Sequence, residues 1–327
     1  MLRLAREWVW DFWFADDGRL FHLYYLQAPR ALGDPGLRHR HARIGHATSP
    51  DLVHWNPAGE VLGPAAAPAF DDMATWTGSV LRAPDGTWCM FYTGSSVVEG
   101  GYVQRIGLAT SADLYSWRKH PASPVLAADP RWYERSGGGV LDETWRDPWV
   151  FADPGGDGWH MLLTARAGED GQSGQDGQSG QGGQGAHGDR GVIGHARSAD
   201  LVRWEACPPL SQAGAGFWHL EVPQVEVVDG RPVLLFSGPR YVTDGVGVTW
   251  WVPCESVLGP FDVARSVPVA GAELYSGRLI RDRGGQWVLL AFRNLGPDGG
   301  FVGEITDPMP VSWDRAGEAL VVQTLPG

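Results

Sequence analysis

The chain of 327 residues lacks the features that mark helical, membrane-spanning and disulfide-stabilised proteins. No long segment free of Gly and Pro keeps apolar residues at i, i+3 and i+4, so little α-helix is expected. The three cysteines are far apart and contain no C-x-x-C pair, which favours free thiols over a disulfide framework or a zinc site. The N-terminus lacks the apolar core of a signal peptide, and no run is long enough to cross a membrane. The sequence therefore predicts a cytoplasmic protein without a membrane partner.

Positive charge is also scarce. The 26 basic residues face 38 acidic residues, which gives a formal net charge of −12. Such a balance disfavours nucleic acid and anionic membrane surfaces as partners, because both are negatively charged. Neutral or cationic ligands fit this composition better.

The sequence contains internal repeats that are typical of β structure. A turn with Gly followed by an aromatic-rich strand occurs five times, and the turn glycines are Gly18, Gly86, Gly158, Gly230 and Gly285. The gaps between them leave room for the other strands of one sheet, as a propeller blade requires. We therefore predict an all-β protein, a five-bladed β-propeller that forms a single domain over residues 1–327 and has no C-terminal β-sandwich. A large sandwich, the alternative, would not predict five equivalent turns.

A second repeat supports the same fold. The pattern Ile-Gly-x-Ala, followed by Ser-x-Asp-Leu and then Trp, occurs over residues 44–55, 106–117 and 193–204. Each copy is typical of a short strand, a tight turn and a Trp that opens the next strand.

One segment breaks the pattern. Residues 168–189 consist of Gly, Gln, Ser and Asp with hardly an apolar side chain, so burial cannot offset the entropy of ordering them. We expect a disordered loop within the third blade.

Three acids precede turn glycines at similar distances. Asp11, Asp147 and Glu221 stand before the first, third and fourth of them, and Glu226 is a nearby rival to Glu221. Because the first strand of a blade lines the central channel, these acids are expected to converge on one axis. Carboxylates that repel one another are costly unless a cation or a reaction uses them. Glycoside hydrolysis does so, with one carboxylate attacking or activating water and another donating a proton to the leaving oxygen.

Four blocks of sequence resemble the ordered signatures of glycoside hydrolase families 32 and 68, the invertases, fructan hydrolases and levansucrases. They are Trp10-Asp11-Phe12-Trp13, Trp76-Thr77-Gly78-Ser79, Arg146-Asp147-Pro148 and Glu221-Val222-Pro223. The resemblance implies that Asp11 is the nucleophile, that Asp147 stabilises the transition state and that Glu221 is the acid/base. It also implies that Gln27 lines the sugar site.

Further residues are candidates for binding the sugar. Aromatic side chains beside the acids can offer apolar faces to a sugar ring, and Arg146 can orient the carboxylates or bind a hydroxyl. The predicted substrate-binding set is Trp10, Trp13, Gln27, Trp76, Ser79, Arg146 and Trp218.

The function expected from these residues is that of a retaining glycoside hydrolase, or a transglycosylase, acting on β-fructofuranosides or a related furanoside. The substrate is an oligosaccharide or small glycoside, and neither a cofactor nor a metal is expected. An inverting arabinofuranosidase or xylosidase similar to family 43 is a rival, in which Asp11 would be a general base. A non-catalytic sugar-binding propeller is a second alternative.

Overall fold

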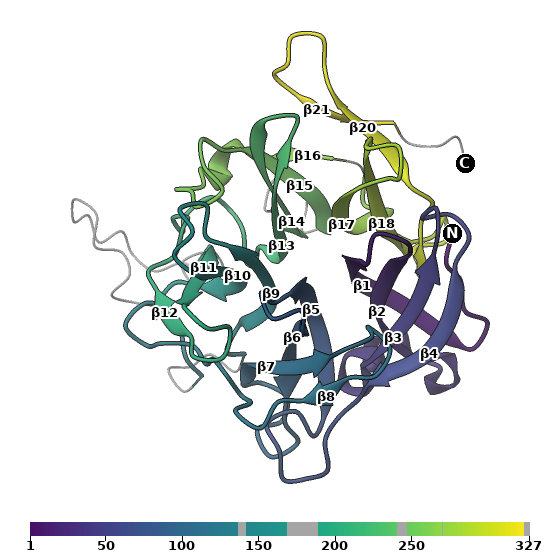
Figure 1. Ribbon diagram of the computed structural model, residues 1–327, viewed down its shortest axis with the longest axis vertical. Coiled ribbons are helices and arrows are strands. Elements are labelled where there is room, and N and C mark those ends of the chain that lie inside the picture. Colours follow the sequence, from purple (N-terminus) through teal and green to yellow (C-terminus); the bar gives the residue numbers. More distant parts are fainter. Residues whose placement is uncertain (137–141, 169–188, 241–246, 270, 324–327) are drawn as a thin grey trace.

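The computed structural model describes residues 1–136, 142–168, 189–240, 247–269 and 271–323. Five antiparallel sheets surround a central axis in chain order, as Figure 1 shows, so the predicted five-bladed β-propeller is confirmed. The first strand of each sheet lies nearest the axis and the later strands lie progressively outward. The predicted loop over residues 168–189 falls almost entirely outside the described residues.

Each of the first four blades is a four-stranded sheet that alternates in direction. Blade I contains β1 (Glu7–Asp16), β2 (Phe21–Pro29), β3 (Arg43–Ser49) and β4 (Asn56–Leu62). Blade II contains β5 (Ala74–Arg82), β6 (Trp88–Ser95), β7 (Gln104–Ser111) and β8 (Arg118–Lys119). Blade III contains β9 (Trp145–Ala152), β10 (Trp159–Arg166), β11 (Gly191–Ser198) and β12 (Glu205–Cys207). Blade IV contains β13 (Glu221–Val228), β14 (Arg231–Pro239), β15 (Gly247–Pro253) and β16 (Val267–Pro268).

Blade V departs from this plan by one extra strand. Its strands are β17 (Leu274–Arg281), β18 (Trp287–Leu295), β19 (Phe301–Ile305), β20 (Met309–Trp313) and β21 (Leu320–Val322). Both β19 and β20 pair with β18, each along a different part of it. The helical segments of the described residues are three 3-10 helices, η1 (Arg30–Leu32), η2 (Pro35–His41) and η5 (Val263–Arg265).

The backbone conformation of the five turns explains why the first repeat contains Gly. All five adopt positive φ, with values of 86°, 91°, 104°, 83° and 82° for Gly18, Gly86, Gly158, Gly230 and Gly285. Residues with a Cβ are disfavoured in that region, whereas glycine enters it without steric cost. Each of these turns joins the first strand of a blade to the second, and the repeat therefore marks the innermost hairpin.

The second repeat forms the turn after the third strand in blades I, II and III. In blade II, the carboxylate of Asp113 accepts the backbone N–H groups of Tyr115 and Ser116 at 2.9 and 2.7 Å. Leu114 is buried with φ 66°, and Trp117 directly precedes β8. The predicted strand, turn and Trp are thus confirmed.

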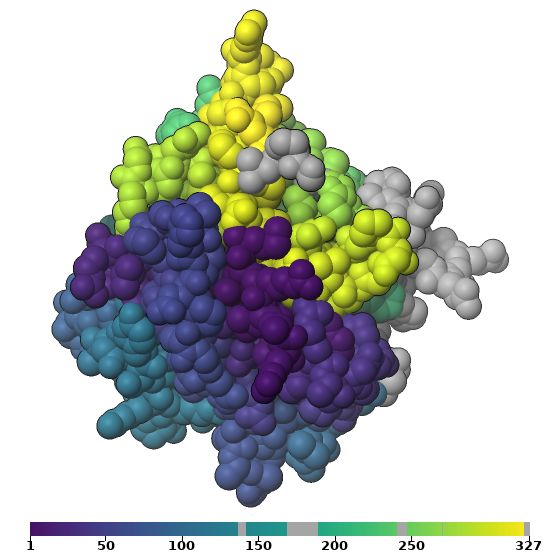
Figure 2. Space-filling view, turned by 90° about the vertical axis from the view of Figure 1, so that its right-hand side faces the viewer, coloured from purple at the N-terminus to yellow at the C-terminus, as the bar shows by residue number. Residues whose placement is uncertain are grey.

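The ring closes through the first residues of the chain. Leu2 exchanges two backbone hydrogen bonds with Ile305 of β19, at 2.9 and 3.0 Å. At the turn of the β17–β18 hairpin, Arg283 forms a bidentate ion pair with Asp16 of blade I at 2.7 and 2.9 Å. In Figure 2 the N-terminal segment lies against the last blade. Blades I and V, which are far apart in sequence, are therefore joined directly.

Among the described residues, no helix has the length and apolar character needed to cross a membrane.

Candidate active site

A bulge interrupts the first strand of every blade. The regular pairing with the second strand breaks beside Asp11, Thr77, Asp147, Val222 and Ser276. Four of these residues have positive φ, with 27° for Asp11, 58° for Asp147, 53° for Val222 and 51° for Ser276. Non-glycine residues in that conformation are strained, and such strain concentrates at functional sites. The bulges therefore mark where the axis-facing strands leave regular β geometry.

A cavity of about 610 Å³ opens at these bulges. Asp11, Asp147 and Glu221 all line it, so the predicted convergence of the three acids is confirmed. Their positions along the strands are only partly equivalent. Asp11 and Asp147 occupy the bulge itself, whereas Glu221 lies one residue before the bulge residue Val222.

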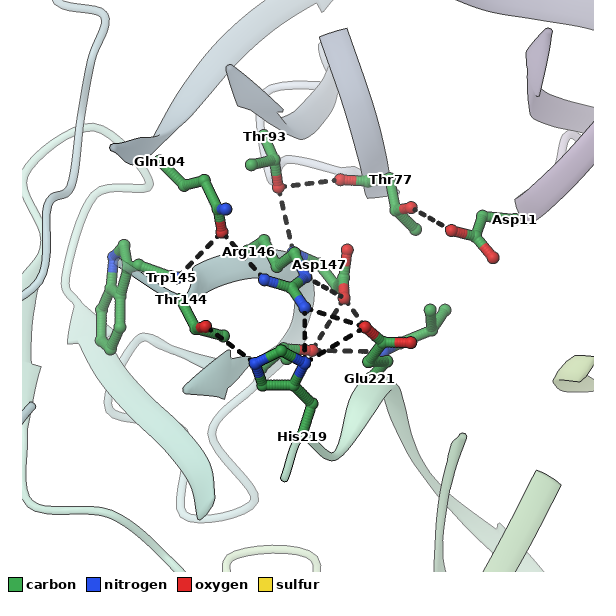
Figure 3. A network of polar contacts seen from close by, with 12 residues as sticks. Asp11, Thr77, Thr93, Gln104, Thr144, Trp145, Arg146, Asp147, His219 and Glu221 are labelled. Carbon is green, nitrogen blue, oxygen red and sulfur yellow. Dashed lines mark hydrogen bonds and ion pairs between the residues drawn. The ribbon is translucent and has the colours of Figure 1, made fainter. Parts of the chain in front are cut away.

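Asp11 is held from the blades on both sides. The hydroxyl of Thr77 in β5 donates to its Oδ2 at 3.2 Å, and the hydroxyl of Ser276 in β17 donates to its Oδ1. Figure 3 shows the Thr77 contact. Burial, followed by the negative charge of Asp147, raises the pKa of Asp11 to about 7. Asp11 therefore holds a proton more readily than an ordinary aspartate.

Asp147 accepts hydrogen bonds from its own blade and from the next. Its Oδ2 accepts the Thr164 hydroxyl at 2.7 Å and the Val222 N–H at 3.1 Å. Its own N–H donates to the Thr93 hydroxyl of blade II at 3.0 Å. Burial raises the pKa of Asp147, and the Arg146 charge opposes that change. The carboxylate is thus held by blades III and IV, and the backbone N–H by blade II.

Glu221 has the opposite electrostatic surroundings. Arg146 Nη2 donates to its Oε1 at 2.8 Å, and the Tyr275 hydroxyl donates to its Oε2 at 2.5 Å (Figure 3 shows the Arg146 pair). Burial favours the protonated form of Glu221. The His219 ring, the charge of Arg146 and the Tyr275 hydroxyl outweigh burial and hold the pKa of Glu221 well below its usual range.

Comparison with known proteins agrees with this geometry. Residues 14–174 match the family model "Glycosyl hydrolases family 32 N-terminal domain". "Beta-fructofuranosidase 1" of Zea mays is 30% identical over 202 residues, which cover 59% of this chain and 25% of that protein. The predicted relationship to the glycoside hydrolase clan of families 32 and 68 is confirmed.

Solved structures of this clan share the fold. An inulosucrase from Halalkalicoccus jeotgali, bound to kestose, has a TM-score of 0.74 at 23% identity and covers 98% of this chain and 90% of its own. Bacillus subtilis levansucrase has a TM-score of 0.73 at 17% identity, with coverages of 97% and 86%. The curated relatives are longer, and the chain spans 15% to 33% of the length of four of them. The family match includes Asp147 but neither Asp11 nor Glu221.

Three of the substrate-binding residues predicted from the clan resemblance and the aromatic pattern line the cavity. They are Trp10, Trp76 and Arg146. The Trp76 indole donates to the backbone oxygen of His39 at 2.7 Å, which fixes its ring against η2. Arg146 also donates to Gln104 Oε1 at 3.2 Å, so its guanidinium is braced on the side opposite Glu221 (Figure 3).

Four other residues predicted to bind the sugar lie outside the cavity lining, and their role stays a prediction. Trp13 is fully buried and stacks on Tyr24 with ring centroids 6.1 Å apart. Ser79 accepts the Val150 N–H at 3.1 Å and so links blades II and III. The remaining two are Gln27, which pairs along the second strand of blade I, and Trp218, which stacks on the Arg166 guanidinium at 4.4 Å.

Glu226, the sequence rival of Glu221, also lies outside the lining. It lies further along β13, where its carboxylate accepts a hydrogen bond from Gln224 at 3.2 Å. Burial raises the pKa of Glu226 to about 7. The structure therefore favours Glu221 as the acid of the cavity.

Several cavity residues were missed. Tyr275 lines the cavity, and Ser276 beside it binds Asp11. Both lie on the first strand of the fifth blade, so the repeat itself contained the signal that could have identified them. Arg38 and His39 lie on η2, in the connection between β2 and β3, which matches no repeat. Burial, with the Arg38 charge, lowers the pKa of His39 to about 4. Among the described residues, no cluster of three His, Cys, Asp or Glu suited to a metal ion occurs.

Proposed function

We propose that this protein is a retaining glycoside hydrolase that acts on β-fructofuranosides. The observation that carries the proposal is that two consecutive residues of β17 donate hydrogen bonds to two different carboxylates of the cavity. Tyr275 binds Glu221 and Ser276 binds Asp11, which orients both acids towards one cavity. A pair of carboxylates flanking one position is what glycoside hydrolysis requires.

The proposed mechanism has two steps. Asp11 attacks the anomeric carbon while Glu221 gives its proton to the departing oxygen, which leaves a glycosyl ester on Asp11. Glu221, now ionised, takes a proton from water as that water attacks the same carbon and releases Asp11. Asp147 accepts hydrogen bonds from ring hydroxyls, and these contacts strengthen as positive charge develops on the sugar.

This mechanism needs its proton on Glu221, whereas the free protein favours Asp11. The Arg146 ion pair is a main reason, because it stabilises the ionised form of Glu221. A sugar hydroxyl that accepts a hydrogen bond from Arg146 would weaken that ion pair and raise the pKa of Glu221. Substrate binding would thereby help to transfer the proton to the residue that must donate it.

The choice of β-fructosides rests on the relatives. The similar proteins include β-fructofuranosidases, an inulosucrase and a levansucrase. An inverting enzyme similar to family 43 has no support among them. Because the chain spans only part of the curated relatives, the substrate stays a proposal.

Transfer to a sugar hydroxyl is a second candidate activity. The inulosucrase and the levansucrase match this chain over 90% and 86% of their own length, and their names describe fructan synthesis. Both reactions use the same three acids, and the acceptor alone differs. Measuring free fructose and longer oligosaccharides from sucrose at low and high sucrose concentration separates them.

The test combines three variants with a substrate screen. Asp11→Asn and Glu221→Gln are each expected to lower kcat for fructosides by roughly 10²–10⁴-fold, because each removes a proton-transfer or nucleophilic step. Glu226→Gln is the matched control and should retain activity, since Glu226 lies outside the cavity lining. NMR of the first product should show retained anomeric configuration.

Each contrary result has a definite meaning. Unchanged turnover in Asp11→Asn and Glu221→Gln would refute the assignment of the acids. Initial product of inverted configuration would support the inverting alternative. Binding of fructosides without turnover by the intact protein would support a sugar-binding propeller.

A further inference from the structure

A second buried arginine lies on the first strand of blade V, and the proposed reaction assigns it no role. Arg278 of β17 is 1% exposed. Its Nε donates to the backbone oxygen of Phe12 at 3.1 Å, and its Nη1 donates to the backbone oxygen of Pro223 at 2.8 Å. One guanidinium thus joins β17 to β1 and β13.

The two acceptors stand next to the proposed catalytic acids in sequence. Phe12 directly follows Asp11, and Pro223 follows Glu221 by two residues, across the bulge. A planar guanidinium holds two acceptors in fixed directions, which a flexible ammonium group does not. The Arg278 side chain therefore sets the position of one backbone oxygen beside each acid.

The charge of Arg278 is buried as well. The guanidinium lies 5.2 Å from the Trp149 ring centroid, and Nη2 is a buried donor without a hydrogen-bond partner in the described part of the chain. Burial lowers the pKa of Arg278 to about 10, while the carboxylates of Asp147, Asp11 and Glu226 oppose this change. The interaction is reciprocal, so the positive charge of Arg278 favours the ionised forms of Asp11 and Asp147.

We infer that Arg278 is a positioning residue that fixes the strands of Asp11 and Glu221 relative to each other and supplies positive charge that favours ionised Asp11. The inference rests on the proposed function, because it concerns the same two acids. Asp11 also faces other charged and polar groups. They are Arg38 of η2, Thr77 of β5, Asp147 of β9, Glu221 of β13, and Tyr275 and Ser276 of β17.

A purely structural role would look different. Arg278 would then stabilise the joint between blades without changing the titration of Asp11. Arg283 provides the matched comparison, because it joins the same blades V and I through Asp16, at the β17–β18 turn. Its loss should weaken that joint without changing the charge beside Asp11.

The experiment compares Arg278→Met, Arg278→Lys and Arg283→Met with the unaltered protein. Carboxyl-carbon NMR of protein labelled with ¹³C-aspartate measures the pKa of Asp11, with its signal assigned by Asp11→Asn. Without the charge, in Arg278→Met, the Asp11 pKa should rise. In Arg278→Lys and Arg283→Met the titration should stay close to that of the unaltered protein. This measurement does not depend on turnover, so it remains decisive if the proposed function is wrong.

Measuring turnover tests whether Arg278 fixes the strands of Asp11 and Glu221 relative to each other. Arg278→Lys retains the charge but not the paired hydrogen bonds, and kcat on fructosides should fall roughly tenfold or more with little change in KM. Arg283→Met should lower the unfolding temperature and leave kcat unchanged.

Two results would overturn the inference. One is an Asp11 titration that is the same in folded Arg278→Met and in the unaltered protein. The other is full activity of Arg278→Lys in a protein that hydrolyses fructosides. If Arg278→Met does not fold, Arg278→Gln removes the same charge and serves in the same titration.

Discussion

At the scale of single residues, the cavity separates two carboxyl groups by their surroundings. Asp11 is bound by two hydroxyl groups, and burial raises its pKa to about 7. Glu221 is bound by a guanidinium and a phenol, which hold its pKa well below the usual range. Together they carry one proton over a wide range of pH, and that is the number of protons that a retaining mechanism uses.

The pH dependence of kcat/KM follows from this count. Below about pH 7 the pair in the free protein holds one proton, and above that pH it holds none. Because the reaction needs that proton, kcat/KM for sucrose is expected to fall about tenfold per pH unit above pH 7. The measurement is initial rate against pH from 4 to 9, with stability checked by returning each sample to pH 6. A profile that instead rises through pH 7 would contradict the shared-proton state.

The sequence predicted those residues of the cavity that belong to a short motif. Arg146-Asp147-Pro148 and Trp10-Asp11-Phe12-Trp13 supplied two acids, an arginine and the aromatic residue Trp10. Trp13 and Ser79, which were also predicted from short blocks, lie outside the cavity lining. Both follow a bulge by two residues, and which way a side chain turns after a bulge depends on the pairing of the strands.

At the scale of elements, the bulged first strands are linked by hydroxyl groups on second strands. The N–H groups of Asp147, Val222 and Ser276 donate to hydroxyls of the preceding blade, at 3.0, 3.2 and 2.9 Å. The acceptors are Thr93, Thr164 and Ser237, on β6, β10 and β14. These contacts satisfy N–H groups that the bulges remove from regular pairing.

Blade II shows how tightly the bulge is packed. A Cβ at Gly78 would lie 2.0 Å from the Phe91 backbone oxygen, which cannot move without breaking the β5–β6 pairing. We expect Gly78→Ala to lower the free energy of unfolding by at least about 3 kcal/mol. Because Thr77 precedes this glycine and binds Asp11, activity should fall as well. The measurement is urea unfolding followed by tryptophan fluorescence.

Gly18→Ala is the control for this substitution. Gly18 has φ 86°, but no atom lies within 4 Å of a Cβ placed there. Backbone strain alone should therefore cost about 1–2 kcal/mol. Equal losses in the two variants would show that the close approach at Gly78 relaxes at little cost.

At the scale of the whole molecule, five blades form a ring that must close. Closure depends on the N-terminal segment, because Leu2 pairs with Ile305 and is 3% exposed within a hydrophobic cluster that joins residues of blades I, II and V. Asp11 also bridges the closing blades, since Ser276 of blade V binds its carboxylate. The site is therefore assembled only when the first and last blades meet.

Leu2→Ala tests this dependence. Removing a buried leucine side chain at the joint is expected to cost about 2–4 kcal/mol of unfolding free energy. Met1→Ala, at a neighbouring position that is 47% exposed, should cost much less. Urea unfolding of both variants measures the difference. If Leu2→Ala matches Met1→Ala, the ring closes without support from this residue.

The sequence by itself determined the fold, because both repeats are local. A glycine with positive φ and a Ser-x-Asp-Leu turn depend on neighbours within a few residues. The glycine turn occurs once in each of five blades, and the Ser-x-Asp-Leu turn occurs in three of them. Only the tertiary structure decided which side chains reach the cavity and how its acids are charged. Those properties depend on residues from other blades, as Tyr275 and Arg146 do for Glu221. No local pattern along β13 carries that information, because burial and charge at Glu221 depend on strands brought together by closure of the ring.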